Sequence, residues 1–140
     1  MVLSDDVPVR LGPVRILLVE DEALVAMLVE DELIEAGARV LGPAASVDEA
    51  LRLLDSVMAD GGVDGAVLDM NLGGRSVMPV ANALAQHAVP FIFMTGYGDT
   101  GGHGPHAGVP TLQKPFTPRE LIGTLGRVIR VRAPGLTAGI

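Results

Sequence analysis

The chain has 140 residues and a mass of 14.5 kDa, which is the size of one domain and excludes a second globular one. Hydrophobic residues make up 49 % of the chain and cysteine is absent, so we expect a core without disulfide bonds or thiolate metal sites, in a reducing cytoplasm. The formal charge of −7 disfavours nucleic acid and anionic membranes as direct partners, and no apolar run approaches the roughly 18 residues of a membrane span.

The two ends of the chain have the composition of flexible tails. Residues 1–13 and residues 133–140 contain proline and glycine and show no apolar period. The sequence therefore predicts one folded domain over residues 14–132.

Five short apolar runs predict buried β-strands. In chain order they cover residues 14–19, 39–41, 65–68, 90–94 and 109–112. The runs are continuous and do not alternate with polar residues, which indicates strands that are covered on both faces. Such strands are typical of a parallel sheet.

The segments between the runs show helical spacing. Over residues 23–36 the apolar positions Ala26, Val29 and Leu33 recur at steps of three and four, and Gly37 follows where a helix commonly ends. Further helices are predicted after the capping pair Ser46 and Glu49, over residues 76–87 with Pro79 near the start, and after the capping pair Thr117 and Glu120.

The segment between the fourth and fifth predicted strands does not show this helical spacing, because it contains many glycine and proline residues. We expect residues 98–108 to be irregular and mobile, so that the fourth helix is short, irregular or missing. Elsewhere strands and helices alternate, which predicts an α/β doubly wound sheet of five parallel strands in the order 2-1-3-4-5.

Reactive side chains follow four of the predicted strands directly. Ligands gather at the carboxyl edge of an open parallel sheet, so these side chains are expected to share one site. They are Glu20, Asp21 and Glu22 after the first strand, Asp69 and Asn71 after the third, Thr95 after the fourth and Lys114 after the fifth. Crowded carboxylates favour a divalent cation, and Mg²⁺ could take Asp21, Asp69 and the carbonyl of Asn71 as ligands.

This set of residues suits an aspartyl-phosphate. If Asp69 attacks a phosphorus atom, Mg²⁺ and Lys114 would offset the charge on the phosphoryl oxygens and Thr95 would hydrogen-bond one of them. Each residue taken alone has an ordinary structural explanation, such as a helix cap or a solvated strand end. Four of them at four strand ends are much harder to explain as caps.

The motifs Val19-Glu20-Asp21-Glu22, Val67-Leu68-Asp69-Met70-Asn71, Met94-Thr95-Gly96 and Lys114-Pro115-Phe116 closely resemble the receiver domains of two-component response regulators. The resemblance covers roughly residues 14–132 and implies a flavodoxin-like (βα)₅ fold. It also implies that Asp69 takes a phosphoryl group from a histidine kinase or a histidine phosphotransfer protein. By the same resemblance Glu20 and Asp21 are the acidic pair at Mg²⁺, Asn71 lends its carbonyl, Thr95 is the switch hydroxyl and Lys114 pairs with the phosphoryl group.

Phe91 to Tyr97 further resembles a receiver subgroup whose fourth strand ends in Phe-Ala-Thr-Gly-Tyr. Two departures from the family stand out. Thr111 occupies the position of the usual aromatic switch residue, a role that Tyr97 could take over. Gly73 and Gly74 lie in the loop where a proline is common, and they are expected to loosen it.

Three other functions on this fold remain open. A flavin binder would need a glycine- or hydroxyl-rich phosphate loop where the chain has three acids. A phosphohydrolase would use an acid near the nucleophile, where the chain has Asn71, and residues to enclose a substrate. A phosphorylation-independent interaction module is the third alternative. We expect a cytoplasmic single-domain receiver that is not an enzyme toward outside substrates and that signals through protein contacts.

Overall fold

A parallel sheet of five strands lies at the centre of the molecule. The computed structural model describes residues 11–96 and 106–132. The strand order is β2-β1-β3-β6-β7, so the predicted α/β fold and the order 2-1-3-4-5 are confirmed. The strands are β1 (Arg15–Val19), β2 (Arg39–Ala44), β3 (Gly65–Asp69), β6 (Phe91–Thr95) and β7 (Thr111–Gln113).

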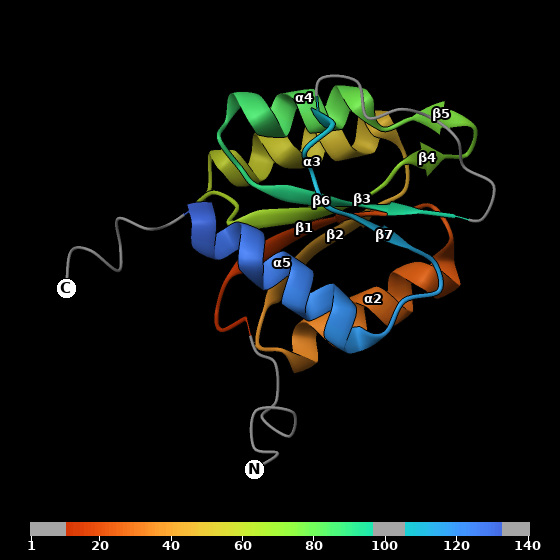
Figure 1. Ribbon diagram of the computed structural model, residues 1–140. Coiled ribbons are helices and arrows are strands. Elements are labelled where there is room, and N and C mark those ends of the chain that lie inside the picture. The colour runs from red at the N-terminus through yellow and green to blue at the C-terminus, as the bar shows by residue number, and fades with distance from the viewer. Residues whose placement is uncertain (1–10, 97–105, 133–140) are drawn as a thin grey trace, which may run out of the picture.

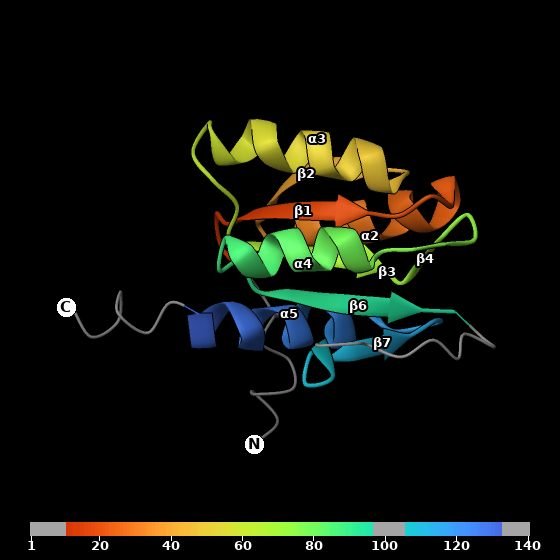
Figure 2. The same cartoon turned by 90° about the horizontal axis from the view of Figure 1, so that it is seen from above.

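Helices cover both faces of this sheet, as Figures 1 and 2 show. Helices α3 (Val47–Met58) and α4 (Met78–Gln86) lie on one face, and α2 (Ala23–Glu35) and α5 (Pro118–Arg132) lie on the other. Alternate residues of one strand therefore enter two different cores. Leu17 and Phe93 are fully buried in the core under α3 and α4, whereas Ile16 and Leu18 are fully buried in the other core. This double coverage is the reason that the strands read as continuous apolar runs.

The helix ends follow the predicted capping residues. The Ser46 hydroxyl accepts the Glu49 N–H at 3.1 Å at the start of α3. At the start of α5, Thr117 and Glu120 exchange two such bonds, of 3.0 and 2.8 Å. Gly37 ends α2 with a φ of +98°, a left-handed conformation that a side chain would strain. The helices begin and end within a few residues of their predicted bounds.

Helix α2 is apolar on more than the face it buries. Its predicted inner positions Ala26, Val29 and Leu33 are at most 3 % exposed. Its outer side, which carries acidic residues, also exposes four large apolar side chains, by 51 to 65 % each. They are Leu24, Met27, Leu28 and Ile34, and we call them the α2 stripe.

A short antiparallel hairpin after β3 was not predicted. It pairs β4 (Asn71–Leu72) with β5 (Arg75–Ser76) through a turn at Gly73 and Gly74. The glycines that we expect to loosen this loop lie in a defined turn between two paired strands. Their φ values of +58° and +90° are those of a type I′ turn, which needs two successive left-handed residues and joins strands tightly.

Some predictions fall on residues that the structure does not describe. The predicted irregular segment 98–108 is described only from His106, where Val109 closes a short turn by donating its N–H to the His106 carbonyl at 3.0 Å. Four helices lie among residues 11–96 and 106–132. Within these residues no helix is long and apolar enough to cross a membrane.

Candidate functional site

Three carboxylates meet at the carboxyl edge of the sheet. β1 and β3 are neighbours with Val19 opposite Leu68, so the next residues, Glu20 and Asp69, emerge side by side. Both are buried, with 2 % and 3 % of their surface exposed, whereas Asp21 is exposed. One oxygen from each of the three lies within 4.8 Å of the others. We call Glu20, Asp21 and Asp69 the acidic cluster.

Lys114 brings a positive charge into this cluster from the end of β7. Its backbone N–H donates to the Thr95 carbonyl at 2.8 Å, which fixes the residue against β6. Its Nζ lies 2.9 Å from Oε1 of Glu20 and 3.2 Å from Oδ2 of Asp69. A weaker contact of 3.4 Å reaches Oε1 of Glu22, an exposed residue. The ammonium thus bridges the two buried acids.

Backbone N–H groups hold the second oxygen of each buried acid. The Glu22 N–H donates to Oε2 of Glu20 at 3.0 Å, and the Asn71 N–H donates to Oδ1 of Asp69 at 3.1 Å. Both carboxylates therefore have one oxygen on Lys114 and the other on the chain that follows them. Their orientation is fixed before any ligand arrives.

Burial of the acidic cluster favours the uncharged form of Glu20. Burial, together with a hydrogen bond to Asp69, raises the pKa of Glu20 from 4.5 to about 7, although the Glu22 N–H and Lys114 act in the opposite direction. Burial lowers the pKa of Lys114, but its bond to Glu20 and the charge of Asp69 outweigh this and raise the pKa above its ordinary value. One ammonium therefore does not fully compensate the cluster.

This donor set fits a hard divalent cation. Carboxylate oxygens are the ligands that Mg²⁺ and Ca²⁺ prefer, and three residues present them within one ion's reach. The exposed Asp21 leaves the cluster open toward solvent, which suits Mg²⁺ because this ion keeps several waters.

The side chains of two predicted site residues form hydrogen bonds with backbone groups. Thr95 ends β6, the strand next to β3, and its hydroxyl donates to the Gly96 carbonyl at 3.1 Å. The side-chain oxygen of Asn71 accepts the Gly74 N–H at 2.8 Å, within the β4–β5 turn. The structure thus places both residues at the carboxyl edge, with Thr95 across from the strand that carries Asp69.

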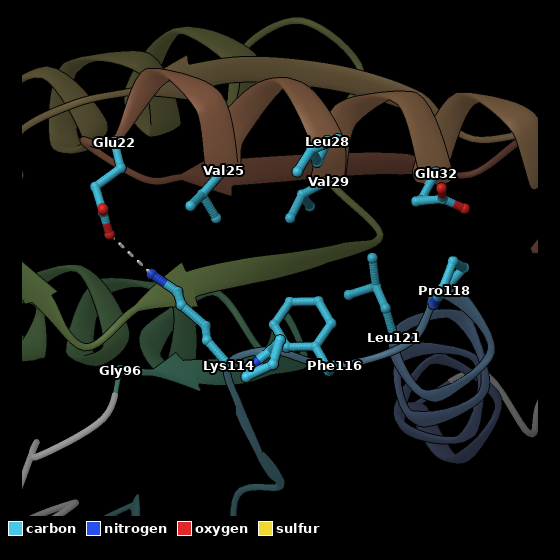
Figure 3. Close-up of a pocket in the computed structure, with 11 residues that line it drawn as sticks. Glu22, Val25, Leu28, Val29, Glu32, Gly96, Lys114, Phe116, Pro118 and Leu121 are labelled. Carbon is cyan, nitrogen blue, oxygen red and sulfur yellow. Dashed lines mark hydrogen bonds and ion pairs between the residues drawn. The ribbon is translucent and has the colours of Figure 1, made fainter.

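A cavity of about 640 Å³ opens beside Lys114 and was not predicted. Figure 3 shows it between α2 and the segment that leads from β7 into α5, with the Glu22–Lys114 contact at one end. Apolar side chains make up most of its wall, among them Val25, Leu28 and Phe116. We call it the α2 groove. The sequence does carry a signal for this groove, namely apolar residues on the outer side of α2. A search for the inward-facing positions of the helix does not reveal them.

Comparisons with known proteins agree with this geometry. Residues 16–125 match the family model of the response regulator receiver domain. A comparison with curated proteins found no match. Among solved structures, SdrG from Sphingomonas melonis Fr1 is 40 % identical, over 84 % of this chain and 97 % of its own, with a TM-score of 0.71.

Two further solved structures are similar at lower identity. A receiver protein from Sinorhizobium medicae WSM419 is 26 % identical over 86 % of this chain and 97 % of its own, with a TM-score of 0.71. The receiver domain of PhyR from Erythrobacter litoralis is 26 % identical over 84 % of this chain and 91 % of its own, with a TM-score of 0.68. Receiver domains are typically signalling modules and not enzymes. The matched family model, the flavodoxin-like fold and the acidic cluster together show that the chain belongs to the response regulator receiver domain family.

Proposed function

We propose that Asp69 accepts a phosphoryl group from a phosphohistidine on a histidine kinase or a histidine phosphotransfer protein, with Mg²⁺ as cofactor. The observation that carries this proposal is the setting of Asp69. It is a buried carboxylate, fixed by the Asn71 N–H, 3.2 Å from an ammonium and within reach of two further acids. A nucleophile held in this way needs little reorganisation to react.

The transfer is a displacement at phosphorus. A carboxylate oxygen of Asp69 forms a bond to phosphorus while the bond from phosphorus to the donor's imidazole nitrogen breaks, and the imidazole leaves with that electron pair. Lys114 moves from the carboxylates to a phosphoryl oxygen, whose negative charge it offsets. Water later attacks the phosphorus of the acyl phosphate, which returns Asp69 and releases phosphate.

Glu20, Asp21, Asp69 and the carbonyl of Asn71 would hold the metal ion. When bound, Mg²⁺ supplies positive charge beside the transferring phosphoryl oxygens. The carboxylates supply the negative charge that would attract it.

The signal would begin at Thr95. Phosphorylation raises the negative charge at Asp69 from one to about two, next to the strand that ends in Thr95. The Thr95 hydroxyl then exchanges the Gly96 carbonyl for a phosphoryl oxygen, which shifts Gly96. A downstream protein would read that shift. We further propose that the chain belongs to the receiver subgroup marked by the motif from Phe91 to Tyr97.

The donor protein would dock along α2. The α2 groove opens beside Lys114, and the exposed α2 stripe continues its apolar surface along the helix. Acidic residues flank this surface, with Glu22 and Glu32 in the wall of the groove. A donor with apolar side chains and a basic rim fits it. We expect Leu28→Ser to slow transfer from the donor protein while transfer from acetyl phosphate stays unchanged. Arg52→Ser, on the opposite face, should change neither rate.

The proposal is tested by intact-protein mass spectrometry after incubation with acetyl phosphate. We expect a gain of one phosphoryl group that requires Mg²⁺ and that is lost in Asp69→Asn. Asparagine is nearly isosteric, so circular dichroism should show an unchanged fold. Equal uptake by Asp69→Asn would contradict the proposal. No uptake by the wild type, from acetyl phosphate or from histidine kinases, would favour a phosphorylation-independent module.

A further inference from the structure

The β4–β5 hairpin begins two residues after Asp69 and borders the acidic cluster. Figure 1 shows it at the end of β3, beyond the edge of the sheet. Leu72 and Val77 are buried in the core and anchor its two strands. A methyl group added at Gly73 would lie 3.7 Å from Oδ2 of Asp21. The turn is therefore next to one of the three carboxylates.

The hairpin also determines where the backbone of Asn71 points. The Met70 carbonyl accepts the Val77 N–H at 3.2 Å, so Met70 directs its carbonyl toward the returning strand. Backbone groups of successive strand residues point to opposite sides, so Asn71 directs its N–H and its carbonyl away from β5. The Asn71 N–H donates to Asp69, which shows that this side is the side of the acidic cluster. The Asn71 carbonyl faces the same way.

We propose that Gly73 and Gly74 are positioning residues for the metal site, because their turn holds the backbone of Asn71 against Asp69. This inference rests on the proposed function, since it assumes that the cluster binds Mg²⁺. The type I′ turn needs a positive φ at both positions, and glycine supplies it without steric cost. The Gly74 N–H then reaches the Asn71 side chain at 2.8 Å and ties the turn to the residue it positions.

The chain offers a matched control for the test. Gly74 has a φ of +90° and Gly62 has a φ of +83°, and a methyl group added at either would meet no atom within 4 Å. Alanine at either position therefore introduces a similar backbone strain. Gly62 follows α3 and precedes β3, at the opposite edge of the sheet from the acidic cluster. Only Gly74→Ala should disturb Asn71.

The experiment is isothermal titration of Mg²⁺ into the wild type and the variants. We expect Gly74→Ala to raise the Kd for Mg²⁺ by about tenfold, the usual effect of losing a group that orients a ligand. Gly62→Ala should bind like the wild type while its loss of thermal stability matches that of Gly74→Ala.

The outcomes separate this inference from the proposed function. A wild type that does not bind Mg²⁺ would overturn the metal site itself. If the wild type binds and Gly74→Ala binds equally well, the positioning role is wrong. An equal loss of affinity in Gly62→Ala would also overturn it, because strain alone would then explain the effect. Should Gly74→Ala not fold, Asn71→Ala removes the contact to the Gly74 N–H, and unchanged Mg²⁺ affinity in that variant would contradict the inference.

Discussion

Replacing Lys114 by methionine tests whether electrostatics hold the acidic cluster together. Methionine keeps an unbranched apolar stem of similar length and removes only the ammonium. Glu20 and Asp69 then remain buried without the bonds of 2.9 and 3.2 Å that compensate them. Removing one partner of a buried ion pair costs about 3–5 kcal/mol, and we take the lower value because the Lys114 side chain is still 17 % exposed.

A loss of about 3 kcal/mol corresponds to a fall in Tm of about 6–12 °C in a domain of this size. The assay is urea unfolding at pH 8 and at pH 5, with EDTA present. At pH 5 Glu20 is protonated in the folded chain, since its pKa is raised to about 7, so the loss should be much smaller there. The exposed Arg52→Met is the control and should change stability little at either pH. Equal losses in Lys114→Met at both pH values would refute the electrostatic reasoning.

Two further predictions concern the cluster and the core. The folded-state pKa of Glu20 lies above its ordinary 4.5, so the stability this group contributes is lost as the pH rises from about 4.5 to about 7. In EDTA, the stability of Glu20→Gln relative to the wild type should therefore rise across that window, and a constant difference would contradict the shift. Leu33 lies on the inner side of α2 and is fully buried. Leu33→Ala should lower the free energy of unfolding, measured with denaturant, by about 2–5 kcal/mol. The neighbouring Ile34→Ala, at a side chain that is 54 % exposed, should cost far less; equal costs would contradict the orientation of α2.

Most of the fold could be predicted because its signals are local. The apolar runs mark strands buried on both faces, and the pairs Ser46–Glu49 and Thr117–Glu120 cap helices where the pattern places them. Parallel topology then brings the residues after each strand to one edge without further information. This is why Asp69 and Lys114, 45 residues apart in the chain, could be assigned to one site.

The parts of the structure that could not be predicted depend on features other than the pattern of apolar residues. Gly73 and Gly74 favour a flexible loop when read from the sequence, but two adjacent glycines between short strands also satisfy a type I′ turn. The contact from Lys114 to Glu22 depends on the direction in which α2 leaves β1. Leu28 could not be identified as exposed, because apolar residues occur on both sides of α2 and only packing decides which side is buried.

We propose Asp69 as the residue that carries the phosphoryl group. The most direct measurement is reduction of the acetyl phosphate-treated protein with borohydride, followed by peptide mass spectrometry. Borohydride converts an aspartyl phosphate into homoserine and leaves free carboxylates unchanged. We expect homoserine at position 69, only in samples that contained Mg²⁺. Modification at Glu20 or Asp21 instead, or a phosphoryl group that borohydride does not remove, would contradict it.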